Sequence, residues 1–69
     1  MDSILIFVRQ KKSLRLLNNA GEWGGNFSEA RTFPTTWAAL NVCMKQDLHE
    51  AEIVMRCGSP AYDVLFDVA

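Results

Sequence analysis

Few residues in this sequence have side chains suited to catalysis: a single histidine, His49, and two cysteines, Cys43 and Cys57. Nucleophilic catalysis needs a nucleophile, a base and an orienting group that converge in space. His49 lies in the polar segment Asp47-Leu48-His49-Glu50, and a histidine flanked by acidic residues in a connecting segment is typical of a solvated surface. We therefore expect no catalytic residue, and the sequence favours a protein that is not an enzyme.

Metal and cofactor sites are not indicated by these residues either. A tetrahedral zinc site takes four nitrogen, sulfur or oxygen ligands, and the sequence contains no CxxC pair. The glycines of residues 21–25 match neither a GxGxxG fingerprint nor a phosphate-binding loop. We expect no metal and no cofactor. Cys43 and Cys57 are expected to be reduced, small buried residues, the first on a helix and the second at the end of a strand.

Two pairs of carboxylates have a spacing that places each pair on one face of a strand: Glu50 with Glu52, and Asp63 with Asp67. Paired carboxylates cleave glycosides only across a concave cleft, which a small sheet rarely provides. The sequence therefore predicts a solvated outer face. We take Glu52, Asp63 and Asp67 as candidate contacts for a basic partner.

Charge is divided unevenly along the chain, although the formal net charge is only −1. Residues 1–35 carry five basic and three acidic residues, and residues 36–69 carry two basic and five acidic residues. A basic first hairpin with nearby aromatic residues suits single-stranded nucleic acid. The candidate contacts are Arg9, Lys11, Lys12 and Arg15. Opposite charges on the two halves also suit self-association across a two-fold axis.

Aromatic residues are the strongest candidates for protein binding. Trp23 is surrounded by glycines and is followed by Phe27 and Arg31. Exposed Trp, Tyr and Arg side chains are typical anchors of interfaces, so these three residues form a candidate contact patch. A chain this short also needs apolar cover for its core, so Trp23 has two open roles, partner anchor or core cover. For Trp37 we expect core cover.

The elements that must position these residues fit in one domain, residues 1–69. A chain with 49% hydrophobic and 22% charged residues has the composition of a packed domain. The apolar run from Ile4 to Val8 is too short for a signal peptide or a membrane span, and basic residues follow it instead of preceding it. We therefore expect a cytoplasmic protein without a membrane partner.

Strands are predicted first along the chain. Residues Ile4 to Arg9 are β-branched and aromatic, and Leu14 to Leu17 resume an apolar pattern after a short polar loop. Leu14 and Leu16 are expected on one face of that second strand. Residues 21–28 are expected to form either a loop with exposed aromatics or a short bulged strand, and a short strand over 30–33 would end at Pro34.

A helix and two strands are predicted for the remainder. Thr35 or Thr36 is the expected N-cap, and the helix should end between residues 46 and 48. Its predicted buried stripe is Trp37, Ala39, Leu40, Cys43 and Met44. Residues 50–57 are predicted to form a strand, with Ile53 and Met55 on one face. Residues 62–68 form the last strand, with its even-numbered residues toward the helix and its acidic residues toward water. The result is an α+β fold, β-β-(β)-α-β-β: an antiparallel sheet of four to five strands with one helix packed on one face.

One part of the chain resembles short uncharacterised proteins from bacteria, phages and prophages. The residues that carry the resemblance are Gly21-Glu22-Trp23, the segment Ser28 to Thr35, and Ala39. They follow the pattern G-x-W, then A-R-x-F-x-T, then a helix with alanine in its first turn. In size and class the chain is also similar to small phage-encoded inhibitors of host defence, such as anti-CRISPR proteins. This resemblance implies a protein that acts without catalysis, by covering a surface of a larger complex.

We therefore expect a non-catalytic interaction protein. Its expected partner is a larger protein or ribonucleoprotein complex, as for a phage inhibitor of host defence. The alternatives are a small nucleic-acid-binding module and a structural homodimer.

Overall fold

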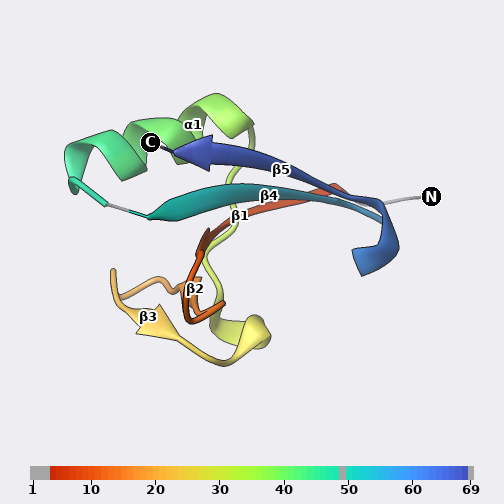
Figure 1. Cartoon of the computed structure of the whole chain (residues 1–69), viewed down its shortest axis with the longest axis horizontal. Coiled ribbons are helices and arrows are strands. Elements are labelled where there is room, and N and C mark those ends of the chain that lie inside the picture. The colour runs from red at the N-terminus through yellow and green to blue at the C-terminus, as the bar shows by residue number, and fades with distance from the viewer. Residues whose placement is uncertain (1–3, 49, 69) are drawn as a thin grey trace.

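A computed structural model of the chain describes residues 4–48 and 50–68. These residues form an antiparallel five-stranded sheet with the strand order β3-β2-β1-β4-β5 and one α-helix (Figure 1). The elements are β1 (Ile4–Gln10), β2 (Leu16–Leu17), β3 (Trp23–Gly24), η1 (Phe27–Glu29), α1 (Thr36–Lys45), β4 (Ala51–Cys57), η2 (Pro60–Tyr62) and β5 (Asp63–Val68). The α+β fold predicted from the sequence is confirmed.

The centre of the sheet is the pair β1 and β4. These two strands are aligned along their whole length, from Ile4 opposite Cys57 to Gln10 opposite Ala51. Because neighbouring side chains of a strand point to opposite faces, this register sorts the apolar residues into two clusters. The cluster on the helix side contains Val8 and Ile53, and the cluster on the other side contains Phe7 and Val54.

Helix α1 begins after the N-cap residue Thr35, whose side chain provides an acceptor for a free backbone N–H of the first turn. The Thr35 side-chain oxygen accepts a hydrogen bond from the backbone N–H of Ala38, 3.1 Å away. The helix buries its two small residues, Ala39 and Cys43, against the sheet. Small side chains allow the helix to approach the strands closely. Thr35, one of the two predicted N-caps, is confirmed, as is the predicted packing of the helix on one face of the sheet. The helix ends at Lys45, slightly earlier than predicted.

The predicted buried stripe of the helix is wrong in part. Trp37 is 67% exposed and Met44 is 66% exposed, whereas Ala38 and Val42 pack partly against the core. Each residue of an α-helix is turned about 100° from the one before. With Ala39 and Cys43 at the centre of the contact, Trp37 and Met44 fall outside the buried contact of the helix with the sheet. Trp37 therefore does not cover the core.

The second strand also differs from the prediction. Leu14 has a positive φ of 58° and is 61% exposed, because it belongs to the turn between β1 and β2. Its backbone N–H donates to the carbonyl of Gln10, which closes that turn. Leu16 and Leu17 are both buried, one in each apolar cluster. Residues 30–33 form no strand; Ala30 makes an isolated bridge to Asn18.

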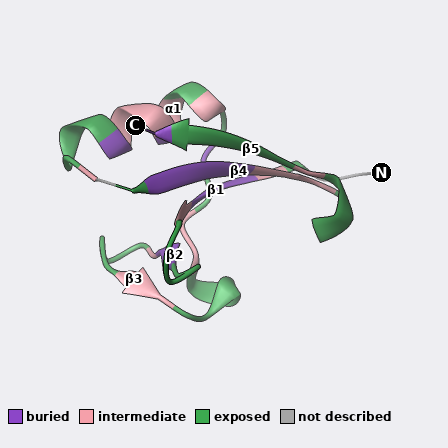
Figure 2. Ribbon diagram, in the orientation of Figure 1, coloured by how far each residue is buried: buried purple, intermediate pink, exposed green. Residues whose placement is uncertain are grey.

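The face of the sheet opposite α1 is covered by η1. The rings of Phe27 and Phe7 meet edge to face, with their centroids 5.3 Å apart. The Arg56 guanidinium lies 5.1 Å from the centroid of each of these rings. The centre of the small sheet is thus covered on both faces, by the helix on one and by η1 with Arg56 on the other. Figure 2 shows the buried residues concentrated in β1, β2 and the first half of β4.

Candidate interaction surface

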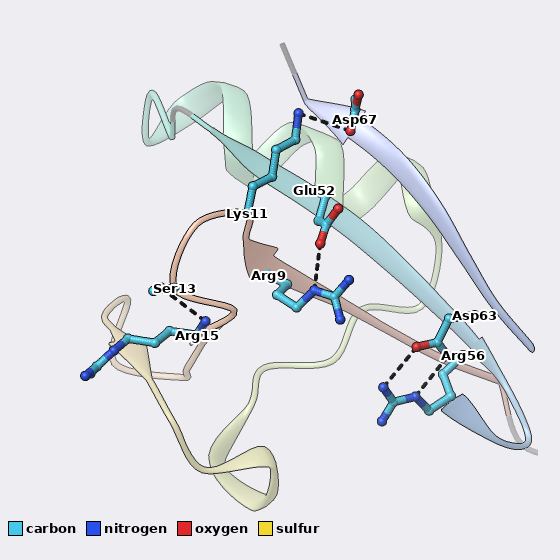
Figure 3. A network of polar contacts seen from close by, with 8 residues as sticks. All are labelled: Arg9, Lys11, Ser13, Arg15, Glu52, Arg56, Asp63 and Asp67. Atoms are coloured by element: carbon cyan, nitrogen blue, oxygen red, sulfur yellow. Dashed lines mark hydrogen bonds and ion pairs between the residues drawn. The ribbon is translucent and has the colours of Figure 1, made fainter. Parts of the chain in front are cut away.

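Charged residues from three strands lie side by side on the face opposite α1 (Figure 3). The register places Arg9 opposite Glu52 and Glu52 opposite Asp67. Four residues further along β4 it places Arg56 opposite Asp63 of β5. Each arginine of this surface therefore lies directly opposite an acidic residue of the neighbouring strand, Arg9 opposite Glu52 and Arg56 opposite Asp63.

Two of the predicted acidic contacts are occupied within the protein. Arg9 Nε donates to Glu52 Oε2 over 2.6 Å, and the Glu52 residue is only 8% exposed. Arg56 donates to both carboxylate oxygens of Asp63, each over 3.0 Å. These hydrogen bonds hold the pKa of Asp63 below its usual range and raise that of Arg56. The expectation that Glu52 and Asp63 face water is wrong, because the facing strands supply arginines.

The third acidic candidate is exposed. The side chain of Asp67 is 76% accessible, and one of its oxygens lies 3.1 Å from Lys11 Nζ. An ion pair this accessible to water contributes little to stability. Of the three predicted acidic contacts, Asp67 is therefore the one that the fold leaves open to a partner.

The basic residues of the first hairpin meet the acids of the second half of the chain. Lys11 pairs with Asp67 and Lys12 Nζ lies 3.4 Å from Glu50. Arg9 is held by Glu52. Arg15 is exposed in the turn. The uneven distribution of charge along the sequence is thus largely balanced inside the fold, and a nucleic-acid phosphate would compete with carboxylates for three of the four predicted contacts.

The predicted aromatic patch is divided between the two apolar clusters. Trp23 is partly buried against the helix-side cluster. Phe27 packs on Phe7 from the opposite cluster. The guanidinium of Arg31 lies 5.0 Å from the centroid of the Phe33 ring. All three side chains therefore have contacts within the protein, and Trp23 contributes to the cover of the core.

Catalytic and metal-binding groups do not converge in the described part of the chain. His49 lies outside the described residues. Among residues 4–48 and 50–68, no group of three His, Cys, Asp or Glu side chains is placed to hold a metal ion. Both thiols are free, with Cys43 buried and Cys57 partly buried, and burial raises the pKa of Cys43. Over the same residues, no helix has the length and apolar character needed to cross a membrane.

An apolar groove that was not predicted from the sequence lies between α1 and β5. A pocket of about 180 Å³ is lined by Thr36, Trp37, Leu40, Ile53, Phe66 and Asp67. Phe66 is 41% exposed, and the neighbouring strand residue on the same face, Val64, is 40% exposed. Exposed apolar side chains that gather in a groove mark a binding surface. The sequence signal was the apolar run from Val64 to Phe66, which carries Leu65 on the face predicted to be acidic.

Strand β5 forms one edge of the sheet, beside this groove (Figure 1). Edge strands of natural proteins are commonly shortened or carry lysine or proline, which prevents pairing with other chains. The opposite edge, β3, follows this rule because it has only two residues. β5 has six residues, neither lysine nor proline among them, and is exposed over most of its length (Figure 2). No strand in the described part of the chain pairs with its outer edge, which is therefore available to another strand.

A larger hollow of about 390 Å³ lies at the turn after β2. It is lined by Asn18, Asn19, Ala20, Ser28 and Glu29. The Asn18 side-chain oxygen already accepts hydrogen bonds from the backbone N–H groups of Ala20 and Glu22. The polar side chain of Asn18 that lines this hollow is therefore used to hold the turn together.

Comparisons of this chain with protein-family models, curated proteins and solved structures gave no match.

Proposed function

We propose that this protein is a non-catalytic interaction protein that binds an extended segment of a partner protein along β5. The observation that carries the proposal is the open β5 edge beside the apolar groove. Backbone groups of an open edge supply hydrogen bonds to an added strand, and adjacent pockets take its alternate side chains. Both features are present on the same side of the molecule.

The residues around the groove support this mode of binding. Trp37 is a large, exposed aromatic residue on the first turn of α1, and such residues are frequent anchors of interfaces. Phe66 comes from the edge strand itself and lines the same pocket as Trp37. An apolar side chain of an added strand opposite Phe66 would lie next to both rings.

The test uses an uncharged strand-forming peptide, acetyl-Thr-Val-Thr-Val-Thr-Val-amide, with nuclear magnetic resonance of the labelled protein. We expect the amide signals of residues 63–68 and the indole N–H signal of Trp37 to shift on titration to about 1 mM peptide. Two N-methylated versions, each blocking alternate peptide amides, separate strand addition from simple apolar contact. Only one version should bind, because alternate N–H groups of a strand point to opposite edges. Equal binding of both versions, or no shift in β5, would overturn the proposal.

Two variants on the same helix sharpen the test. Trp37→Ala should weaken peptide binding about ten-fold, the effect of removing an anchor residue. Met44→Ala is the matched control, since Met44 is as exposed as Trp37 but does not line the pocket. Both variants should leave the free energy of unfolding within about 0.5 kcal/mol of the original.

We place this activity in the cytoplasm, where the free thiols of Cys43 and Cys57 suit a reducing environment. That the partner belongs to a host defence complex stays a prediction from the resemblance described above.

A further inference from the structure

The charges of β5 determine which kind of strand can pair with it. In a symmetric pair of two β5 strands, residues on the same face must oppose each other across the two-fold axis. The alignment that pairs residues 63–67 with their copies places Asp63 opposite Asp67 of the other molecule, twice. Like charges directly opposite each other destabilise a strand pair. In this alignment a second copy is a poor occupant of the edge, whereas the alignment that pairs residues 64–68 with their copies places Asp67 opposite Leu65 and gives its carboxylate no basic neighbour.

Asp67 favours a partner of opposite charge. Its carboxylate is on the face opposite the helix and is 76% accessible, and within residues 4–48 and 50–68 it pairs with the long side chain of Lys11. Glu52, its neighbour on β4, is also acidic and is paired with Arg9. The row across the three strands is therefore Arg9, Glu52 and Asp67, with two acids side by side, and a Lys or Arg side chain on an added strand, directly opposite Asp67, would place a base beside the second acid.

The other face of the edge requires a different side chain. Phe66, the residue before Asp67, points to the groove that it forms with Trp37 and Leu40. Neighbouring residues of the added strand also alternate between the two faces. The residue opposite Phe66 should therefore be apolar, while the residue next to it is basic.

We infer that the occupant of the β5 edge is an extended segment of a partner protein in which apolar residues alternate with Lys or Arg. The apolar residues lie in the groove beside Trp37, and a basic residue pairs with Asp67. This inference rests on the proposed function, since it assigns the chemistry of the segment that the edge binds.

The test compares three peptides of one design: acetyl-Lys-Val-Lys-Val-Lys-Val-amide, the threonine peptide above and the corresponding glutamate peptide. The lysine peptide should bind at least about three-fold tighter than the threonine peptide, and the glutamate peptide should bind weaker than both. Asp67→Lys should reverse the order of the two charged peptides. Glu22→Lys is the matched control, because it changes the net charge equally at an exposed residue in the turn before β3. It should leave the order unchanged.

The outcomes separate this inference from the proposed function. If all three peptides shift the β5 signals with equal affinity, strand addition stands and the basic partner is wrong. A reversal by Glu22→Lys as large as that by Asp67→Lys would show a general charge effect and would also overturn the inference. Dimers that form in sedimentation experiments and are disrupted by substitutions in β5 would assign the edge to a second copy. If none of the peptides binds, both proposals fail.

Discussion

Arg56 and Asp63 lie directly opposite each other on β4 and β5 and share two hydrogen bonds, from Nε to Oδ1 and from Nη2 to Oδ2, each 3.0 Å long. The same guanidinium lies 5.1 Å from the ring centroids of Phe7 and Phe27. This one side chain therefore connects the edge strand, the centre of the sheet and η1. Two-point pairs of this kind are stronger than single charged contacts.

The stability of the protein should fall in acid as this pair is lost. The hydrogen bonds from Arg56 lower the pKa of Asp63 from the usual value of 3.8. A carboxyl group whose pKa is lowered by folding stabilises the folded state above its unfolded pKa, and this stabilisation disappears as the pH falls through the folded pKa. We expect unfolding midpoints in urea to decrease below about pH 4. Asp63→Asn should be less stable at pH 7 and should lose less stability on acidification; an unchanged acid response would contradict this account.

Removal of the Phe27 ring should destabilise the fold, although this residue is 42% exposed. Phe27→Ala loses the contact with Phe7 and the stacking with Arg56, and we expect a loss of about 1–2 kcal/mol in the free energy of unfolding. Tyr62→Ala, at a residue that is 70% exposed, is the control and should have little effect. Urea denaturation followed by tryptophan fluorescence measures both. If Phe27→Ala were as stable as Tyr62→Ala, η1 would not be held to the sheet in solution.

Local patterns in the sequence predicted much of the fold. The alternation of apolar residues located the faces of β4 and β5. The pair Thr35 and Thr36 marked the start of the helix, and Thr35 is the residue whose side chain supplies the missing acceptor. The predicted burial of Trp37 was wrong for a physical reason. The helix turns its small residues Ala39 and Cys43 toward the core, and the hydrophobicity of the side chains alone does not predict that rotation.

The charged residues could not be assigned from local patterns. Arg9 and Glu52 are separated by 43 positions in the sequence and are brought together only by the register of β1 and β4. Asp63 and Asp67 lie on one face of β5 as predicted, whereas the predicted pairing of Glu50 with Glu52 on one strand face is wrong because β4 begins at Ala51, and the environment of each acid depends on the facing strand. The open β5 edge was missed for a similar reason, since the strand order decides which strand lies at the end of the sheet.

The N-cap of α1 should contribute measurably to stability. Thr35→Ala removes the acceptor for the Ala38 N–H, and we expect a loss of about 1 kcal/mol. Thr35→Ser should retain most of the stability, because serine supplies the same acceptor. Thr32→Ala, at an exposed residue before the helix, is the control for the loss of a threonine side chain. Thermal unfolding followed by circular dichroism compares the three variants, and an equal loss for Thr32→Ala and Thr35→Ala would argue against the cap.

The two thiols should differ in reactivity. Cys43 is 1% exposed and burial raises its pKa, so the reactive thiolate is both scarce and inaccessible. Cys57 is partly buried at the end of β4. With a chromogenic disulfide reagent at pH 7.5 we expect one rapid and one slow reaction per chain. Cys57→Ser should abolish the rapid phase, and both thiols should react rapidly in urea. A rapid phase that persists in Cys57→Ser would show that the helix opens readily from the sheet.

Binding of single-stranded RNA tests whether the basic residues of the first hairpin contact nucleic acid or serve only in ion pairs within the fold. Arg9, Lys11 and Lys12 each have a carboxylate partner in the folded chain, so their transfer to phosphates would break these pairs. Affinity for nucleic acid depends on salt according to the number of phosphates that basic residues neutralise. We therefore expect no salt-dependent binding of an oligouridylate near physiological ionic strength, measured by fluorescence anisotropy. Tight binding with a steep dependence on salt, lost in the variant Lys11→Ala/Lys12→Ala, would instead identify the first hairpin as a nucleic-acid-binding surface and would make the pairs with β4 and β5 secondary to that role.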